Sequence, residues 1–184
     1  MKQLQRLAAV AALGLASLAT QAAPIVIDVS GAQSINLQGE AGNTVWLIDI
    51  GANAVLNSLD WTLSLNAFAP SNLSEMQVSF GSSSGLDAIT FAPGAADSFS
   101  GSASYTGSLD LTGVGVAAGA DGKLRIEFSE GYKDFANGVA EGQWVSGNLT
   151  FDVTAAAVPE PASAALVLLG LGMVGLQARR ARRG

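Results

Sequence analysis

The 184-residue sequence contains neither cysteine nor histidine. Without cysteine the protein can form no disulfide framework, no thiolate metal site and no thiol nucleophile. Without histidine it lacks the commonest general base, the imidazole of a Ser-His-Asp triad and the ligands of almost every zinc site. Because few enzymatic mechanisms survive both absences, we expect a protein that is not an enzyme.

Basic residues are scarce between the two ends of the chain. Six of the nine lie in the terminal segments, and between Pro24 and Val158 there are 14 acidic residues against Lys123, Arg125 and Lys133, a net charge of −11. A segment this acidic repels phosphate backbones, so we expect no nucleic-acid partner. Its acidity is more typical of a soluble surface than of a specific cation site.

The first 22 residues have the three parts of a secretory signal peptide. Lys2 and Arg6 give a basic start, and residues 7–19 form an apolar stretch that is short for a membrane span. Small side chains follow at Thr20 and Ala22, which predicts cleavage after Ala22, with Ala23 as the alternative. We therefore expect an N-terminal signal-peptide helix over residues 1–22.

The C-terminal segment combines a proline-rich approach, an apolar stretch and an arginine cluster. Residues 162–178 are uncharged, and as a helix they would extend about 25 Å at about 1.5 Å per residue, just enough to cross a bilayer core. Basic residues beside a membrane segment stay in the cytoplasm, so this end predicts a transmembrane helix whose preceding domain faces outward. The cytoplasmic stop would consist of Arg179, Arg180, Arg182 and Arg183.

This tripartite end resembles the PEP-CTERM sorting signal. The resemblance rests on the order of a Val158, Pro159, Glu160, Pro161 motif, an apolar helix and an arginine cluster, together with the signal peptide. It implies that the membrane transpeptidase exosortase recognises the motif and removes the anchor near it. It also implies a Gram-negative host that makes exopolysaccharide, and hence a biofilm or matrix setting. A permanent single-pass anchor is the alternative for residues 156–184.

The segment between the two ends, residues 23–155, reads as one all-β domain. Apolar and polar residues alternate in short runs, and turn-forming glycine, asparagine, aspartate and serine separate the runs. The pattern predicts strands near residues 25–29, 55–65, 76–80, 105–111, 124–128 and 145–153. In the second of these, Val55 is expected on the same face as Leu59, Trp61, Leu63 and Leu65. Many short strands with patterned faces favour an antiparallel β-sandwich, jelly-roll-like in type.

The three tryptophans are assigned to faces by the same alternation. Trp46 and Trp61 share faces with aliphatic residues, so both are expected in the core. In a regular final strand Trp144 would instead lie with Ser146 and Asn148 on the polar face, where an indole can stack on a sugar ring. The alternative is a strand-end tryptophan that the preceding loop covers.

The preceding loop, residues 130–142, is the other candidate site. It carries Tyr132, Lys133, Asp134 and Glu141, and loops carry function more often than sheet faces do. Tyr132 is therefore a candidate glycan contact beside Trp144. The carboxylates could ligate calcium, but their spacing follows no known calcium loop, so no metal or other cofactor is expected.

Three functions remain open from the sequence. The first is an exported surface or matrix protein, anchored in the inner membrane as a precursor and then sorted by exosortase. The second is a carbohydrate-binding module for exopolysaccharide. The third is a glycan-cleaving enzyme, because paired carboxylates suffice for that chemistry and acidic residues are plentiful.

Overall fold

The computed structural model describes residues 24–156 and Gly170. The described chain is almost entirely β-structure and contains one short 3-10 helix. The elements are β1 (Ile25–Asp28), β2 (Gln33–Ser34), β3 (Thr44–Asp49), β4 (Val55–Ala67), η1 (Leu73–Glu75), β5 (Met76–Ser82), β6 (Ile89–Phe91), β7 (Gly101–Asp110), β8 (Lys123–Glu130) and β9 (Gly142–Thr154).

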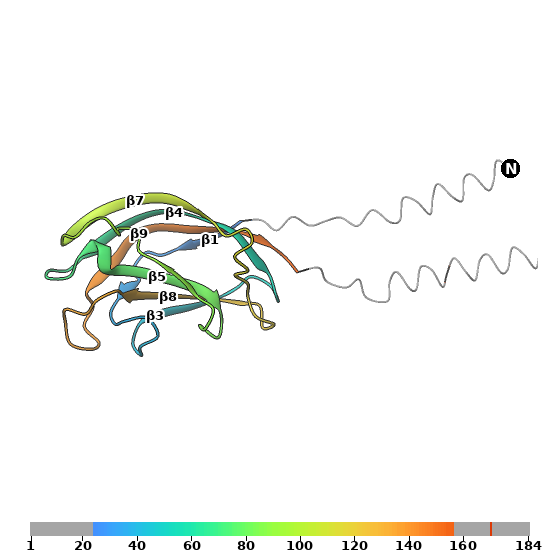
Figure 1. Ribbon diagram of the computed structural model, residues 1–184, viewed down its shortest axis with the longest axis horizontal. Coiled ribbons are helices and arrows are strands. Elements are labelled where there is room, and N and C mark those ends of the chain that lie inside the picture. The colour runs from blue at the N-terminus through green and yellow to red at the C-terminus, as the bar shows by residue number, and fades with distance from the viewer. Residues whose placement is uncertain (1–23, 157–169, 171–184) are drawn as a thin grey trace, which may run out of the picture.

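The strands form two antiparallel sheets that lie face to face (Figure 1). Sheet A has the order β1-β9-β4-β7, with β2 also paired to β9, and sheet B has the order β3-β8-β5-β6. When β2 is left aside, successive strands along the chain alternate between the two sheets. The one exception is β5 and β6, which form a hairpin within sheet B. This is the strand order of an eight-stranded jelly roll. The predicted all-β, antiparallel architecture is therefore confirmed.

Aromatic side chains join the two sheets across the core. Phe80 on β5 meets Phe151 on β9 edge to face, with ring centroids 5.2 Å apart. Within sheet B, Phe128 on β8 packs edge to face on Trp46 of the neighbouring strand β3, with ring centroids 4.8 Å apart. Such edge contacts add stability beyond the burial of apolar area. Trp46 and Trp61 are half buried and pack against the core, as the sequence predicted.

A β-bulge in β4 changes which residues enter the core. Leu56 pairs with Val153 and Ser58 with Asp152, so Asn57 is an extra residue on β4. The extra residue shifts the alternation by one position. Leu56 is therefore fully buried, whereas Val55 is 39% exposed. The prediction that Val55 shares the inner face with Leu59 is wrong for this reason.

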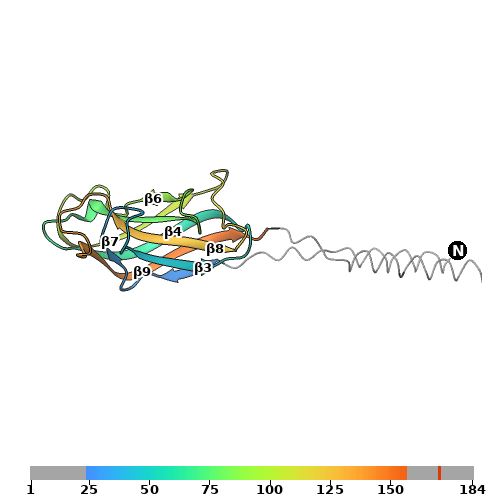
Figure 2. The same cartoon turned by 90° about the horizontal axis from the view of Figure 1, so that it is seen from below.

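The two ends of the sandwich carry different parts of the chain. The first residue of β1, Ile25, pairs with Phe151 near the end of β9, so the described chain starts and finishes at the same end. The β8-β9 loop, residues 131–141, lies at the opposite end (Figure 1). Figure 2 shows the strands of both sheets running lengthwise between these ends. Whatever follows residue 156 thus joins the domain away from that loop.

Apart from Gly170, the expected helices at residues 1–22 and 162–178 lie outside the described residues. Within residues 24–156 and at Gly170, no helix has the length and apolar character needed to cross a membrane.

Candidate functional site

Trp144, the residue expected to stack on a sugar, is buried. Its exposed fraction is 0%, its indole packs edge to face on Phe128 at 5.0 Å, and its Nε1–H donates to the Ser34 hydroxyl at 3.1 Å. A second bulge explains the error, because Ser64 pairs with Ser146 and Leu65 with Trp144, which leaves Val145 unpaired. Val145 points outward instead, at 47% exposure.

The exposure expected for Trp144 is therefore wrong, and this side chain cannot be a glycan contact. The covering elements are β2 and the loop that leads into it, because the Trp144 N–H donates to Ala32 O at 2.9 Å and the Gly31 N–H to Trp144 O at 2.8 Å. The tryptophan side chain packs into the core at the end of the sandwich that carries the loops. Tyr132, the other candidate, is 62% exposed in the β8-β9 loop.

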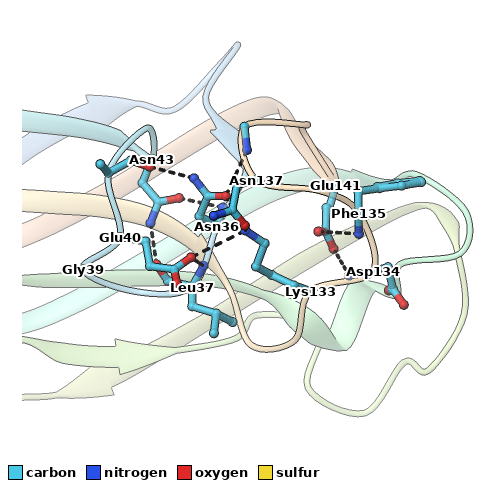
Figure 3. Close-up of polar contacts among 12 residues, drawn as sticks. Asn36, Leu37, Gly39, Glu40, Asn43, Lys133, Asp134, Phe135, Asn137 and Glu141 are labelled. Atoms are coloured by element: carbon cyan, nitrogen blue, oxygen red, sulfur yellow. Dashed lines mark hydrogen bonds and ion pairs between the residues drawn. The ribbon is translucent and has the colours of Figure 1, made fainter.

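Two loops at this end are joined through Asn36 and Lys133 (Figure 3). The β8-β9 loop contributes Lys133, whose ammonium group donates to Asn36 Oδ1 at 2.7 Å and to Asn137. The β2-β3 loop, residues 35–43, contributes Asn36 and Glu40, whose carboxylate lies 3.6 Å from the same ammonium group. The Gly138 N–H also donates to Asn36 Oδ1, at 3.2 Å. Lys133 is thus a structural link between the loops.

The β2-β3 loop is fixed in turn by Glu127 on β8. Its Oε1 accepts the Gly39 N–H and the Asn43 side-chain amide, each at 2.7 Å, and its Oε2 accepts from Arg125 at 2.6 Å. Burial opposes ionisation, but the hydrogen bonds from Asn43, Arg125 and Gly39 hold the pKa of Glu127 below its ordinary value. A buried carboxylate with this many donors is stable as an anion. Sequence reasoning missed this network.

Glu141 organises the β8-β9 loop from the inside. Its side chain is fully buried, and its two oxygens accept the backbone N–H groups of Asp134 at 2.9 Å and Phe135 at 3.0 Å (Figure 3). The backbone also ties the loop to the sheets, because the Glu141 N–H donates to Ser34 O at 2.9 Å. The carboxylate replaces the partners that these loop amides would otherwise find in water.

Glu130, at the end of β8, is the one buried carboxyl group of residues 24–156 whose two oxygens both lack a hydrogen-bond partner. It is 1% exposed, and burial raises its pKa to about 8, with the carboxylates of Glu141 and Glu75 adding to the shift. The nearby Ser34 hydroxyl lowers the pKa somewhat without reaching hydrogen-bond geometry. Burial and the neighbouring carboxylates therefore favour the protonated form of Glu130 in the folded protein.

The acidic groups at this end do not make a metal centre in the described structure. Across residues 24–156, no group of three or more acidic side chains has the arrangement needed to hold a metal ion. The oxygens of Glu75 already accept from the Asn72 backbone at 2.8 Å and from its side-chain amide at 3.2 Å. The groups nearest Glu130 are thus occupied by protein donors.

The residues expected to govern sorting and processing lie outside the described part of the chain. These are Ala22 and Ala23 at the expected signal cleavage site, the motif Val158, Pro159, Glu160 and Pro161, and the arginines Arg179, Arg180, Arg182 and Arg183.

Comparison with solved structures finds weak similarity to several larger or viral proteins. The latent dimeric PorU of Porphyromonas gingivalis is 12% identical, with a TM-score of 0.34 over 72% of this chain and 13% of that chain. The infectious bursal disease virus VP2 subviral particle is 14% identical, with a TM-score of 0.34 over 76% and 34%. The tomato aspermy virus structure is 13% identical, with a TM-score of 0.31 over 89% and 98%.

Comparison of the sequence with known proteins and families gives one positive result. No curated protein matches the chain significantly. The family model of the PEP-CTERM protein-sorting motif matches residues 157–183, which are the residues that showed the resemblance. The chain therefore carries a PEP-CTERM protein-sorting motif directly after its β-sandwich, and that motif implies an exported protein that exosortase sorts.

Proposed function

We propose that this protein is a non-catalytic component of the cell surface or extracellular matrix of a Gram-negative bacterium. Its precursor is anchored in the inner membrane, and exosortase then sorts and cleaves it near Val158–Pro161. The observation that carries the proposal is the sorting motif at residues 157–183, placed directly after a folded β-domain that ends at Thr154. The enzymatic step is thus performed on the protein by its partner.

The arrangement of the domain supports this role. The sorting motif continues from the end of β9, while the β8-β9 and β2-β3 loops lie at the other end of the sandwich. When the tail is held at the membrane or joined to a carrier, the loop end is therefore free to face the surroundings. The internal hydrogen bonds of Lys133, Glu127 and Glu141 keep that end ordered.

Localisation in the host tests the proposal. The full chain is compared with a variant in which Pro159 and Pro161 are replaced by alanine and with one in which Arg179 is replaced by lysine, which keeps the charge. We expect the lysine variant to reach the surface and the alanine variant to stay in the inner-membrane fraction. Normal surface delivery of the alanine variant, or of the unchanged chain in a strain without exosortase, would overturn the proposal.

A carbohydrate-binding role is the second candidate, favoured by Tyr132. Its ring is 62% exposed on the β8-β9 loop, and an exposed aromatic ring beside polar groups suits sugar stacking. Retention of the full chain on the host's purified exopolysaccharide, lost on Tyr132→Ala, is the expected result. Release of reducing ends from that polymer would instead indicate the glycan-cleaving alternative.

A further inference from the structure

The strand β7 (Gly101–Asp110) is by far the longest strand at an edge of either sheet. It has 10 residues, whereas the other edge strands, β1, β2, β3 and β6, have 4, 2, 6 and 3. Within residues 24–156, β7 pairs only with β4, and it does so along its whole length (Figure 1). It therefore presents the longest free sheet edge of the described domain.

The backbone hydrogen bonds show which groups of β7 face away from the sheet. Leu111, directly after the strand, donates its N–H to Asn57 O on β4 at 2.8 Å. Because alternate residues of a strand direct their N–H and C=O groups to opposite sides, the odd-numbered residues of β7 bond to β4. The N–H and C=O groups of the even-numbered residues, from Ser102 to Asp110, therefore form the free edge.

This edge lacks the features by which natural proteins prevent edge strands from pairing. Protected edges carry charged side chains, proline or a β-bulge. Residues 101–109 contain no charged residue and no proline, and the pairing with β4 has no register shift. The side chains do not cover the edge either, because the Ser102 and Ser104 hydroxyls hydrogen-bond back to Asn66 and Ser64 on β4, at 3.1 and 2.8 Å. The edge is therefore open to another strand.

The outward residues of β7 are self-complementary when two copies of the strand pair antiparallel about Thr106. Asp110, the one charged residue of the strand, then lies opposite Ser102 of the second copy and not opposite another aspartate. The even-numbered residues form the hydrogen-bonded pairs of this arrangement, which gives about ten backbone hydrogen bonds between the copies. A typical specific protein interface carries about that number of direct hydrogen bonds.

The inward residues of β7 fit the same arrangement. Tyr105 would lie opposite Gly107 of the second copy, and Leu109 opposite Ala103, so that each large side chain meets a small residue. These four residues are only half buried in the single chain, although Tyr105 and Leu109 already pack against the core. A second β7 strand would therefore cover apolar surface that the single domain leaves accessible to water.

We propose that β7 is an interface between two copies of this chain. The two β7 strands pair antiparallel about Thr106 and join both copies of sheet A into one continuous sheet. The occupant of the edge is a second copy because the strand's own sequence places Asp110 opposite a serine and large inward side chains opposite small ones. The inference goes beyond the proposed function, since it concerns the β-domain alone.

Cysteine cross-linking of the full chain in detergent tests the arrangement, because the natural sequence has no cysteine. In the proposed pairing the two Thr106 Cα atoms lie about 5.5 Å apart, a distance that a disulfide spans. The matched control is Thr62, which is exposed and pairs with Thr106 from β4. Its two copies would lie about 15 Å apart, because each is one strand spacing of about 4.8 Å farther from the dimer axis. We expect Thr106→Cys, and not Thr62→Cys, to form a disulfide-linked dimer on mild oxidation.

Lysine substitutions at the same two positions test the strength of the association. Thr106→Lys places like charges opposite each other at the centre of the interface and should weaken dimerisation at least about tenfold. Thr62→Lys makes the same charge change on the neighbouring strand and should leave the dissociation constant within about threefold of the unchanged chain. Sedimentation equilibrium in roughly 0.5 M NaCl measures both, because salt at that concentration screens the repulsion between two acidic domains. Circular dichroism checks that both variants are folded.

Three results would overturn the inference. The first is no cross-link at position 106, or equal cross-linking at positions 106 and 62. The second is equal weakening of dimerisation by the two lysine variants. The third is a monomeric chain whose retention at the host surface falls in Thr106→Lys, because another protein would then add the strand. All these variants keep residues 157–183 unchanged, so a failure of sorting would contradict the proposed function and not this inference.

Discussion

The Nε1–H of Trp144 donates to the Oγ of Ser34 at 3.1 Å, and both side chains are completely buried. We predict that Trp144→Ala costs about 3 to 5 kcal/mol of unfolding free energy, the usual range for removing a buried aromatic side chain. Trp144→Phe should cost less, because the ring can still pack on Phe128 while the Ser34 hydroxyl loses its donor. Chemical denaturation followed by circular dichroism measures both.

Val145→Ala, at the adjacent exposed position, is the control and should change the unfolding free energy by less than about 0.5 kcal/mol. Similar losses of stability at positions 144 and 145 would contradict the bulge.

Glu130 should make the folded protein less stable as the pH rises. Its pKa is about 8 in the folded chain against an ordinary 4.5, so the folded state holds this proton more tightly. The stability gained from that proton is complete below pH 4.5 and is lost as the pH rises to 8, by up to about 1.4 kcal/mol per pH unit.

Denaturation at several pH values tests this effect. Glu130→Gln should be more stable than the unchanged chain above pH 8 and should flatten the dependence between pH 4.5 and 8. The control is Glu127→Gln, because the pKa of Glu127 is lowered: its contribution is present above its ordinary value of 4.5 and is lost on acidification. An unchanged pH profile in Glu130→Gln would show that this carboxyl is ionised in the folded protein.

Gly147 marks a close approach of the β4 and β9 backbones. Its φ is +116°, and a β-carbon there would lie 2.0 Å from the Thr62 carbonyl oxygen. We predict that Gly147→Ala costs more than about 3 kcal/mol or prevents folding, because the backbone of β4 cannot move aside without breaking the sheet. Gly138→Ala is the matched control, with φ +85° and open space around the new methyl group, and it should cost about 1 to 2 kcal/mol. Equal melting temperatures for the two variants would refute the close contact.

Lys133 should stabilise the loop end locally. Lys133→Met keeps the aliphatic stem but removes the charged donor to Asn36 and Asn137, so the β8-β9 loop should open more often. Hydrogen exchange measures this directly, and we expect faster exchange of the Gly138 amide, which also donates to Asn36. The control is Lys123→Met, which breaks only the exposed ion pair with Asp49. It should leave hydrogen exchange at Gly138 unchanged and should alter the unfolding free energy by no more than about 1 kcal/mol.

The sequence predicted which face of a sheet each side chain occupies wherever apolar and polar residues alternate without interruption. The outward serines and threonines of β7 and the inward Val78, Phe80, Ile126 and Phe128 follow a period of two, so their faces could be predicted. The extra residues at Asn57 and Val145 each reverse the alternation, and neither carries a local signal of a bulge. The errors at Val55 and Trp144 both arose in this way.

The candidate site was only partly predictable for a different reason. The β8-β9 loop could be singled out because its composition is mixed and it precedes the last strand. The partners of Lys133 and Glu127 come from Asn36, Gly39 and Asn43, which are about 85 to 100 residues away in the chain. Such contacts depend on the strand order, which a single sequence does not specify. The raised pKa of Glu130 likewise arises from burial at the end of β8 and from the carboxylates of Glu141 and Glu75, which the fold brings close to it.

The measurement that tests the central claim most directly is the intact mass of the protein recovered from the surface and membrane fractions of its host. We predict a species that begins at Ala23 or Pro24 and ends near Pro161, because the signal peptide and the sorting anchor have both been removed. A surface species that retains Arg183 would contradict the account, since the tail would then be a permanent anchor.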